Sequence, residues 1–597
     1  MAHVVTNGPS MGQEEATDCA RRVRLLSIAI LLVLALVAMV MPQIMGRIGS
    51  PQPTPTMLYA QDLILLPLFC ISVLLFGSGR SEMGTPASLR LTREGLAVAA
   101  VVIFAICLWG HELIFQGMDF SRDEQMAVFD AAVFHSGQLV APIPLAWREI
   151  APALNLQFML PLGDHAAWVS AYLPINAMMR ALVATVIDPL ATSPLLVVVG
   201  LLALAAIGRQ LWPDSPGSQV VALLCYLCSS QVVITGMTAY AVSAHLALNL
   251  VWLLLFMRGD RIGFAGTLIV GFLATGAHQP LFHPLFALPF VLGLIWRRQW
   301  WSVLGYGIGY TVIVGFWLAW PVWLSGQAGP VPAANDAEGI DYVTRLLHVL
   351  ALINRGALWT MAANLIRFVT WQHLLLLPLM LLSVAGGRRS PLVLPLAIGI
   401  VLPILVMGVL LPWQGHGWGY RYLHPVLGNA CLLAGFGWQR VEALRLDLRR
   451  PMLWTTVASV VLLPVHGWMT YRMVASQAVP DQKIARMAAD IAIVDSAPYS
   501  ANLVINAPDL SNRPIRLQGW TLRPADIAAL CGTRWIAFVD APQLDSLNVY
   551  YNDKPVAAPS PHQRLLHAAA RNAGCHVDQG VRSPIAAATA AAMPGQL

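Results

Sequence analysis

Residues 23–41 read VRLLSIAILLVLALVAMVM, with one arginine as the sole charged side chain. A helix needs about 20 mainly apolar residues to cross a bilayer, and within lipid its backbone groups must bond to one another. This stretch therefore predicts a membrane-spanning helix. A cleaved signal peptide is the competing interpretation, but the long polar tail before the run and the lack of an A-x-A site after it favour a retained helix.

The rest of the chain has the same character. Of its 597 residues 57% are hydrophobic and 11% are charged, with a mean hydropathy of +0.64, whereas soluble domains carry roughly 25% charged residues. The sequence predicts a mainly α, polytopic bundle of about thirteen helices, the other twelve apolar runs being residues 58–76, 95–115, 193–212, 219–239, 241–258, 262–277, 281–296, 301–324, 361–384, 391–411, 422–439 and 451–471.

Arginine clusters alternate along the loops between these runs. Such clusters mark cytoplasmic loops, so thirteen crossings place the N-terminus inside and the C-terminus outside. We expect a cytoplasmic tail at 1–22, a membrane domain at 23–471 and a small periplasmic α/β domain at 472–597. Within the membrane domain, residues 117–192 form an outer loop with interfacial helices, and residues 325–360 form a second outer loop. A multi-pass protein of a bacterial inner membrane fits this layout.

Six of the eight cysteines lie in or beside apolar stretches, and two lie in the polar C-terminal segment. Cys225 and Cys228 form a C-x-x-C inside an apolar run, without a second pair, and are interpreted as packing residues. Cys531 and Cys575 are the sole pair in the C-terminal segment, where a disulfide is plausible in an oxidising compartment.

Several classes of function are not supported. The net charge of +6 includes no basic patch interleaved with aromatic residues, so no nucleic acid is expected as a partner. The sequence has no P-loop, no H-E-x-x-H, no dinucleotide-binding glycine run and no D-x-D. No cofactor is expected. A divalent metal would be compatible with the chemistry considered below, but no residue pattern indicates one.

A short acidic stretch, GMDFSRDEQM, occupies residues 117–126 after the third apolar run. Asp123 and Glu124 are candidate catalytic residues, because a carboxylate in surroundings of low dielectric constant can hold a raised pKa and act as a base. Arg122 is expected to line the same cavity. The alternative is a solvated loop in which Asp119 or Ser121 caps a helix.

Two further polar segments are predicted to reach the outer face. The first, GAHQPLFH at 276–283, carries His278, Gln279 and His283 between two short apolar runs. Short, proline-interrupted helices often end at a buried cavity. The alternative is that these are core histidines, satisfied by neighbouring carbonyl groups.

The second segment is WQGHGWGYRYLHP at 413–425. Arg421 suits a phosphate because its guanidinium has a fixed charge and forked donors, and His416 would assist it. Tyr420 and Tyr422 are expected to line the cavity. The alternative is an interfacial arginine within a belt of aromatic side chains. Two amphipathic segments, 168–187 and 341–367, are expected to roof the cavity as helices, or else to lie on the membrane.

Two patterns carry a family resemblance. Asp123-Glu124 is followed by Asp130-Ala-Ala and Gly137 in an interfacial helix, and Arg421-Tyr422-x-His-Pro425 opens a late helix. Together they resemble the GT-C superfamily of membrane glycosyltransferases, which includes protein O-mannosyltransferases and the aminoarabinose transferase of lipid A. Here two helices precede the one that leads into the acidic loop, whereas in that family the loop usually follows the first helix.

The resemblance implies a polyprenyl-phosphate-linked sugar donor and an envelope glycan, lipid or protein acceptor at the outer face of the membrane. It further implies that Asp123, supported by Glu124, deprotonates the acceptor with inversion at the sugar, while Arg421, His416 and His278 bind the donor phosphate. A transporter or lipid flippase with an outward-facing polar cavity is the main alternative. Two further alternatives are a polymerase or ligase of lipid-linked glycans and a non-catalytic membrane scaffold.

Overall fold

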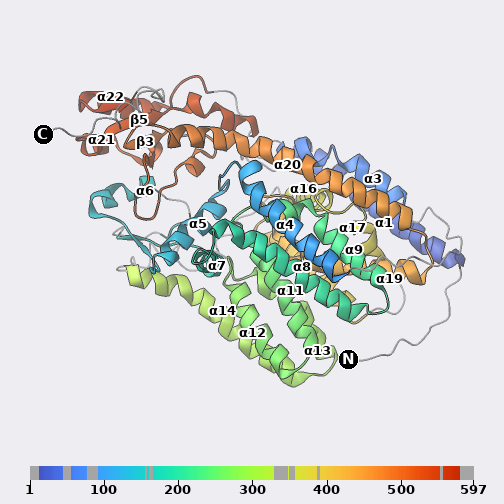
Figure 1. The fold of residues 1–597 in the computed structure, drawn as a ribbon. Coiled ribbons are helices and arrows are strands. Elements are labelled where there is room, and N and C mark those ends of the chain that lie inside the picture. The colour runs from blue at the N-terminus through green and yellow to red at the C-terminus, as the bar shows by residue number, and fades with distance from the viewer. Residues whose placement is uncertain are drawn as a thin grey trace.

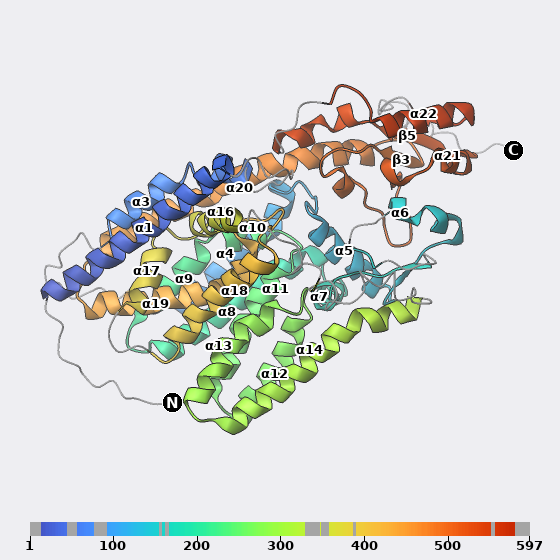
Figure 2. The same cartoon turned by 180° about the vertical axis from the view of Figure 1, so that it is seen from behind.

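The computed structural model describes residues 13–44, 56–76, 92–154, 158–160, 166–328, 347, 357–385, 390–550 and 556–578. The chain is mainly helical, as predicted, with a small C-terminal parallel sheet. Figure 1 shows a tilted bundle of helices with the C-terminal domain at one end, joined to it by the long helix α20. Figure 2 shows the same arrangement from behind, with α1 and α3 lying along α20.

Six helical segments in the described part of the chain are long and apolar enough to cross a membrane. The helices that contain them are α1 (Gln13–Ile44), α4 (Arg93–Leu113), α8 (Thr192–Leu211), α14 (Trp300–Ala328), α18 (Val393–Leu410) and α20 (Arg449–Ala485). Shorter apolar helices pack among them: α9 (Pro216–Leu227), α11 (Val242–Arg258), α12 (Arg261–Thr275), α13 (Phe282–Trp296) and α19 (Leu427–Ala443).

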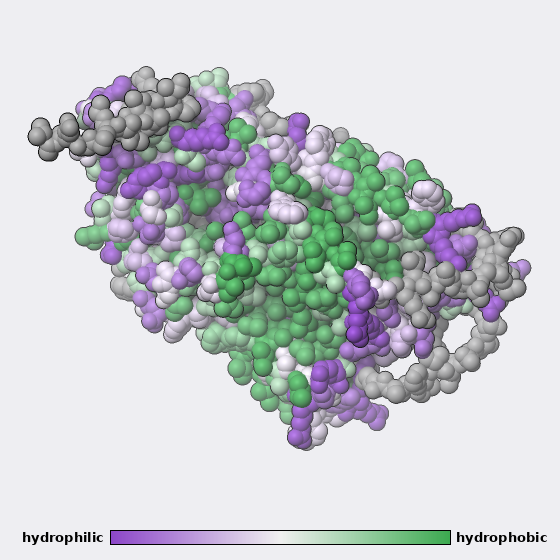
Figure 3. All heavy atoms as spheres, in the orientation of Figure 1, coloured by the Kyte–Doolittle hydropathy of each residue, from purple (hydrophilic) through white to green (hydrophobic). Residues whose placement is uncertain are grey.

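The surface of the bundle is apolar. Val101 and Leu113 on α4 are 68% and 73% exposed, and large apolar side chains of α14 and α18 are exposed in the same way. Figure 3 shows a hydrophobic band between polar ends on one face of the molecule. Apolar surface on this scale requires a cover of lipid, so the protein is an integral membrane protein. The count of thirteen crossings stays a prediction.

Three runs predicted as single helices are broken. Residues 58–76 form a π-helical turn (Leu58–Asp62) and α3 (Leu66–Leu74). Residues 219–239 divide into α9 and α10 (Ser230–Thr235), and residues 361–384 divide into α16 (Ala357–Thr370) and α17 (Leu376–Val384).

The last two breaks meet inside the bundle. Ser229 caps α10 and donates its hydroxyl hydrogen to Gln372 at 2.6 Å, and Gln372 donates to Gln231 at 2.8 Å. Broken helices within a membrane need such internal partners for their freed polar groups. These polar side chains therefore stabilise the breaks. The breaks cannot be recognised from the sequence, because both runs are hydrophobic along their length.

Helix α20 runs well past the predicted domain boundary at residue 472 and ends at Ala485. The segment 484–493 contains the end of α20 and then strand β3 (Ile491–Val494). All four residues of β3 are buried, because the strand is central in a parallel sheet. Such a strand lacks the polar–apolar alternation that would distinguish it from a buried helix.

The C-terminal domain is built on four parallel strands in the order β4-β3-β5-β6. The remaining strands are β4 (Ile515–Gln518), β5 (Trp535–Val539) and β6 (His576–Asp578). Helices α21 (Pro524–Cys531) and α22 (Pro561–Asn572) cover the sheet. The predicted α/β class is therefore confirmed for this segment, and a disulfide joins Cys531 to Cys575.

The outer segment after α4 packs directly against this domain. Helix α5 (Arg122–His135) places Met126, Phe129 and Val133 in one apolar cluster with Ile491 and Ile493 of β3. The segment 168–187 is not one helix as expected. Its first residues pair as β2 (Ala167–Trp168) with β1 (Ala141–Pro142), and only α7 (Ile175–Val183) is helical. Most of 341–367, the second segment expected to cover the cavity, lies outside the described residues.

The turn between α13 and α14 and the turn between α19 and α20 carry arginine clusters. Both lie at the end of the bundle away from the C-terminal domain (Figure 1). This separation agrees with arginine-rich ends on one side of the membrane and the C-terminal domain on the other.

Candidate active site

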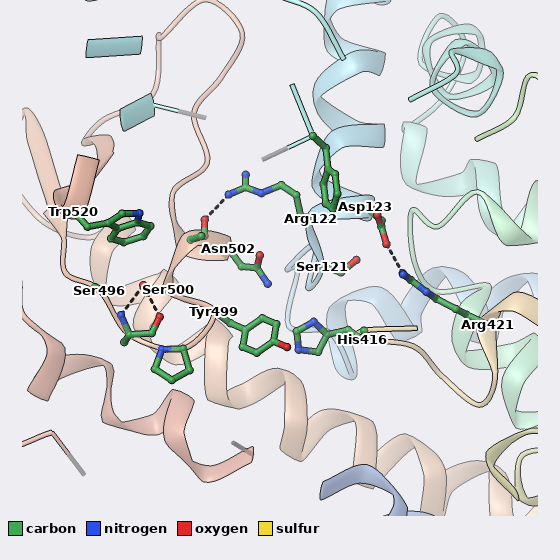
Figure 4. A pocket seen from close by; sticks show the side chains of 15 residues that line it. Ser121, Arg122, Asp123, His416, Arg421, Ser496, Tyr499, Ser500, Asn502 and Trp520 are labelled. Atoms are coloured by element: carbon green, nitrogen blue, oxygen red, sulfur yellow. Dashed lines mark hydrogen bonds and ion pairs between the residues drawn. The ribbon is translucent and has the colours of Figure 1, made fainter. Parts of the chain in front are cut away.

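A pocket of about 470 Å³ lies between the bundle and the C-terminal domain (Figure 4). One wall comes from the start of α5 and the loop before residue 421, and the opposite wall comes from the C-terminal domain. The lining residues are Ser121, Arg122, Asp123, Phe158, Gly415, His416, Arg421, Ser496, Ala497, Pro498, Tyr499, Ser500, Ala501, Asn502 and Trp520.

The first turn of α5 positions Asp123. Ser121 is the N-cap, and its hydroxyl accepts a hydrogen bond from the Glu124 backbone at 3.4 Å. The Glu124 carboxylate in turn accepts from the Ser121 backbone at 3.2 Å and from its hydroxyl at 2.9 Å, which completes a capping box. Asp123 is thereby fixed at a helix N-terminus, where the helix dipole favours a negative charge.

A loop that depends on glycine positions Arg421. Gly415 and Gly419 adopt positive φ angles of 63° and 66°, a conformation that residues other than glycine rarely adopt. Gln414 bridges the loop, because its amide donates to the Gly419 carbonyl at 3.1 Å and its oxygen accepts from the Arg421 backbone at 2.9 Å. Arg421 then begins a short 3-10 helix (Arg421–Val426) with its side chain directed into the pocket.

Asp123 and Arg421 form an ion pair in this pocket. The other carboxylate oxygen of Asp123 accepts a hydrogen bond from the Tyr172 hydroxyl. Arg421 also donates to the Tyr422 hydroxyl at 3.3 Å, and its guanidinium lies 5.1 Å from that ring and 5.6 Å from the ring of Tyr240. Aromatic side chains thus surround the charge pair and shield it from water.

The pair determines the charge state of Asp123. Burial by itself would raise the pKa of this carboxyl, but Arg421 and the Tyr172 hydroxyl hold the pKa below its usual range. Burial, together with the nearby charge of Asp119, raises the pKa of Glu124 well above its usual value. The two neighbouring acids therefore differ, with Asp123 ionised and Glu124 favouring the protonated form.

His416 lines the pocket, but its ring is held among aromatic rings. Its centroid lies 4.7 Å from that of Phe120 and 4.6 Å from that of Tyr499. Burial lowers the pKa of His416 to about 3 and that of His278 to about 4. Both histidines are therefore neutral at physiological pH, and neither supplies the fixed positive charge expected for a phosphate ligand. Arg421 is the one arginine or lysine in the two loops 276–283 and 413–425.

Other predicted site residues lie behind the pocket wall. Glu124 closes the capping box, and Tyr422 holds Arg421 from behind. The ring of His278 packs against that of Tyr172 at a tilt of 36°, with ring centroids 4.3 Å apart. Gln279 is half-buried in the adjoining turn between α12 and α13. None of these four side chains lines the pocket.

The last two predicted residues have partners inside the bundle. His283 bonds to Asn249 and to the Tyr310 hydroxyl, both at 2.7 Å. The Tyr420 side chain is fully buried, and its hydroxyl donates to the sulfur of Met361 at 3.6 Å. Both side chains therefore serve the packing of the bundle and do not line the pocket.

Arg122 lines the pocket, but its charge faces the C-terminal domain. Its guanidinium donates to the Ala501 carbonyl and, at 3.3 Å, to the Val504 carbonyl. Its neighbour Gln125 donates to the Asn502 carbonyl at 2.9 Å. These bonds join the first turn of α5 to the C-terminal domain.

Sequence reasoning missed the C-terminal wall of the pocket and Tyr172. The wall residues at 496–502 stand in a turn with no charge and no catalytic motif, so only the contact with α5 reveals them. Tyr172 lies within a segment expected to roof the site, and its aromatic polar side chain was the available signal. Among the described residues, no group of three or more His, Cys, Asp or Glu side chains could hold a metal ion.

A second charge pair lies inside the bundle. Asp62 and Arg367 are fully buried, with Arg367 Nε 3.5 Å from the carboxylate. Thr370 and Trp371 donate to Asp62 at 2.8 Å and 2.9 Å, and Arg367 donates to the Gly417 carbonyl at 2.9 Å. This network supports the loop that carries His416 and Arg421.

No protein-family model matches the chain, and no curated protein matches it in sequence. Solved structures do. The architecture is similar to that of ArnT. The apo structure of ArnT from Cupriavidus metallidurans matches with a TM-score of 0.45 and 13% identity, covering 70% of this chain and 84% of that one. ArnT from the same organism bound to undecaprenyl phosphate matches with a TM-score of 0.43 and 12% identity, covering 77% and 87%.

Proposed function

We propose that the protein is a glycosyltransferase that moves a sugar from a polyprenyl-phosphate carrier to an acceptor hydroxyl. The observation that carries this proposal is the Asp123–Arg421 pair, one potential base and one fixed cation, in a pocket at the end of a membrane bundle. Their side chains are 11% and 17% exposed, so ligands can reach them while bulk water is largely excluded.

The pair suggests how binding of the donor prepares the site. A phosphate that reaches Arg421 competes with Asp123 for the guanidinium, and a forked arginine donor suits a phosphate well. Separation of the pair leaves the Asp123 carboxylate without its countercharge and so raises its proton affinity. Donor binding thereby turns a neutralised carboxylate into a base.

The reaction then follows from the two charges. Asp123 takes the proton of the acceptor hydroxyl as that oxygen bonds to the anomeric carbon. The bond from this carbon to the phosphate oxygen breaks, and its electron pair leaves with the polyprenyl phosphate. Arg421 stabilises the negative charge that develops there. Attack opposite the leaving group inverts the configuration of the sugar, which must lie between the two side chains.

The partners of this reaction are the bilayer, a polyprenyl-phosphate-linked sugar, and a glycan, lipid or protein acceptor of the cell envelope. Undecaprenyl phosphate, which ArnT from Cupriavidus metallidurans binds, belongs to this class of carrier. We place the protein in a bacterial inner membrane with the pocket and C-terminal domain in the periplasm, where lipid-linked sugars replace nucleotide sugars as donors.

Transfer of labelled sugar from a polyprenyl-phosphate donor in membranes tests the proposal. Asp123→Asn should lower the rate by about 100-fold or more, the usual contribution of a general base. The matched control is Asp260→Asn, because Asp260 also lies at a helix N-terminus, as the N-cap of α12, and pairs with an arginine at 2.8 Å, but on an exposed surface. An unchanged rate in Asp123→Asn would remove the transferase from consideration.

A transporter or lipid flippase is the second candidate, and the buried Asp62–Arg367 pair is the observation that favours it. Charges inside a membrane often mark a substrate path. Uptake of a labelled polyprenyl phosphate into sealed vesicles, lost in Asp62→Asn and retained in Asp123→Asn, would support this candidate instead.

A further inference from the structure

The C-terminal domain supplies about half of the pocket lining. Its contribution is the turn at 496–502 and Trp520. In Figure 4, Trp520 lies at the end of the pocket opposite the Asp123–Arg421 pair, and Tyr499 and Asn502 lie between the two ends. The pocket is therefore elongated, with the charge pair at one end and an aromatic side chain at the other.

The chemistry of the C-terminal lining is distinctive. Its polar and aromatic side chains are those of Ser496, Tyr499, Ser500, Asn502 and Trp520, its other three residues are two alanines and a proline, and none of the eight is charged. Aromatic faces pack against the apolar faces of sugar rings, and small polar groups bond to hydroxyls. A phospholipid headgroup or a charged peptide would find no countercharge on this wall.

We propose that this wall is an acceptor subsite that binds the uncharged sugar residues of an oligosaccharide, with Trp520 as the stacking platform farthest from the reaction. This inference rests on the proposed function and narrows its acceptor to a glycan. A sugar stacked on Trp520 would extend along Tyr499 and Asn502 toward Asp123. The acceptor then presents at least two sugar residues to the pocket.

Hydrogen bonds hold the subsite in fixed relation to the base. The two carbonyls that bind Arg122, those of Ala501 and Val504, belong to the turn that forms the wall or directly follow it. Gln125 donates to the Asn502 carbonyl at 2.9 Å and to the Asp119 carbonyl at 2.8 Å. Because these bonds span the pocket on its α5 side, the subsite is formed before a ligand enters.

Direct binding tests the inference without any transfer reaction. The full-length protein in lipid nanodiscs is applied to an array of defined bacterial oligosaccharides, serine- and threonine-rich peptides and phosphatidylglycerol. We expect binding to oligosaccharides, and Trp520→Ala should weaken it by about tenfold, the loss of one stacked ring. The matched control is Trp535→Ala, since Trp535 is 39% exposed on the same domain but lies outside the pocket.

Asp123→Asn separates the two proposals, because it should abolish transfer while oligosaccharide binding persists. Retention of wild-type glycan affinity in Trp520→Ala would overturn the subsite, as would selective binding of the peptides or the lipid, or no binding to any oligosaccharide. If Asp123→Asn loses transfer and any of these results is also found, the proposed transferase function stands and only the glycan subsite is refuted.

Discussion

Asp123 and Arg421 form an ion pair across 298 positions of sequence. Asp123 lies in the first turn of helix α5, and Arg421 lies where a loop with two glycines of positive φ enters a late helix. Each alone has an ordinary structural explanation, as a helix-terminal carboxylate or an interfacial arginine. Their contact inside one pocket places a carboxylate and a fixed cation where both can meet the same ligand.

Replacement of Asp130 should stabilise the protein at alkaline pH. Burial raises the pKa of Asp130 from 3.8 to about 7, so the folded state holds the proton more tightly than the unfolded chain. Stability is then fully present below about pH 4 and falls as pH rises toward 7, by about 1.4 kcal/mol for each unit of the shift. Asp130→Asn removes that loss and should raise the Tm at pH 8 but not at pH 4.

Thermal unfolding at a series of pH values measures this effect. The control is Asp214→Asn at an exposed loop position, which should leave the pH dependence unchanged. Equal Tm values for Asp130→Asn and wild type at pH 8 would show that the burial of Asp130 carries no such cost.

Replacement of Arg122 should loosen the C-terminal domain from the membrane bundle. Arg122→Ala removes the guanidinium that donates to the carbonyls of Ala501 and Val504, and loss of a hydrogen bond from a charged group costs about 1.5–3 kcal/mol. Hydrogen exchange of the 496–504 segment should become faster, and the rate of sugar transfer should fall while the affinity for the lipid-linked donor is retained. Arg523→Ala, at an exposed residue of the same domain, is the control. Wild-type exchange in Arg122→Ala would refute this coupling.

Much of the fold could be predicted because a bilayer constrains a chain so strongly. Apolar runs near the length of a span became helices, and Asp-Glu after the third run did open a helix, α5. The helix breaks at Ser229 and at Gln372 could not be predicted, because each break is stabilised by a polar side chain from a distant run. The buried strand Ile491–Val494 could not be distinguished from a helix by its sequence, because a strand covered on both faces shows no alternation of polar and apolar residues.

The site was predictable in its charges but not in its shape. Arg421 and Asp123 stood out as charged groups at the outer ends of apolar runs. Histidines stood out equally, yet His283 is satisfied within the bundle by Asn249 and Tyr310. Which of several polar groups face one hollow depends on how the C-terminal domain packs on α5, and no local pattern encodes that contact.

The disulfide between Cys531 and Cys575 should form in cells and stabilise the C-terminal domain. The bond closes a loop across 44 positions, and such a closure contributes about 4 kcal/mol in the chain-entropy treatment. Reduction should therefore lower the Tm of this domain. Cys531→Ser combined with Cys575→Ser should show the same loss and no further effect of reductant.

Thiol labelling in intact cells tests the predicted compartment at the same time. Both cysteines should react with a membrane-impermeant maleimide only after reduction, since disulfides persist outside the cytosol. Ready labelling of both without reductant would contradict an oxidising location for the domain.

The most direct measurement compares donor binding and sugar transfer in parallel for two variants of the charge pair. Asp123→Asn should bind undecaprenyl phosphate at least as tightly as wild type, because no carboxylate competes for Arg421, and yet transfer no sugar. Arg421→Gln should bind the carrier about tenfold more weakly or worse and should likewise fail in transfer, whereas Arg258→Gln at an exposed surface should match wild type in both assays. Wild-type carrier affinity in Arg421→Gln, or wild-type transfer in Asp123→Asn, would contradict the account.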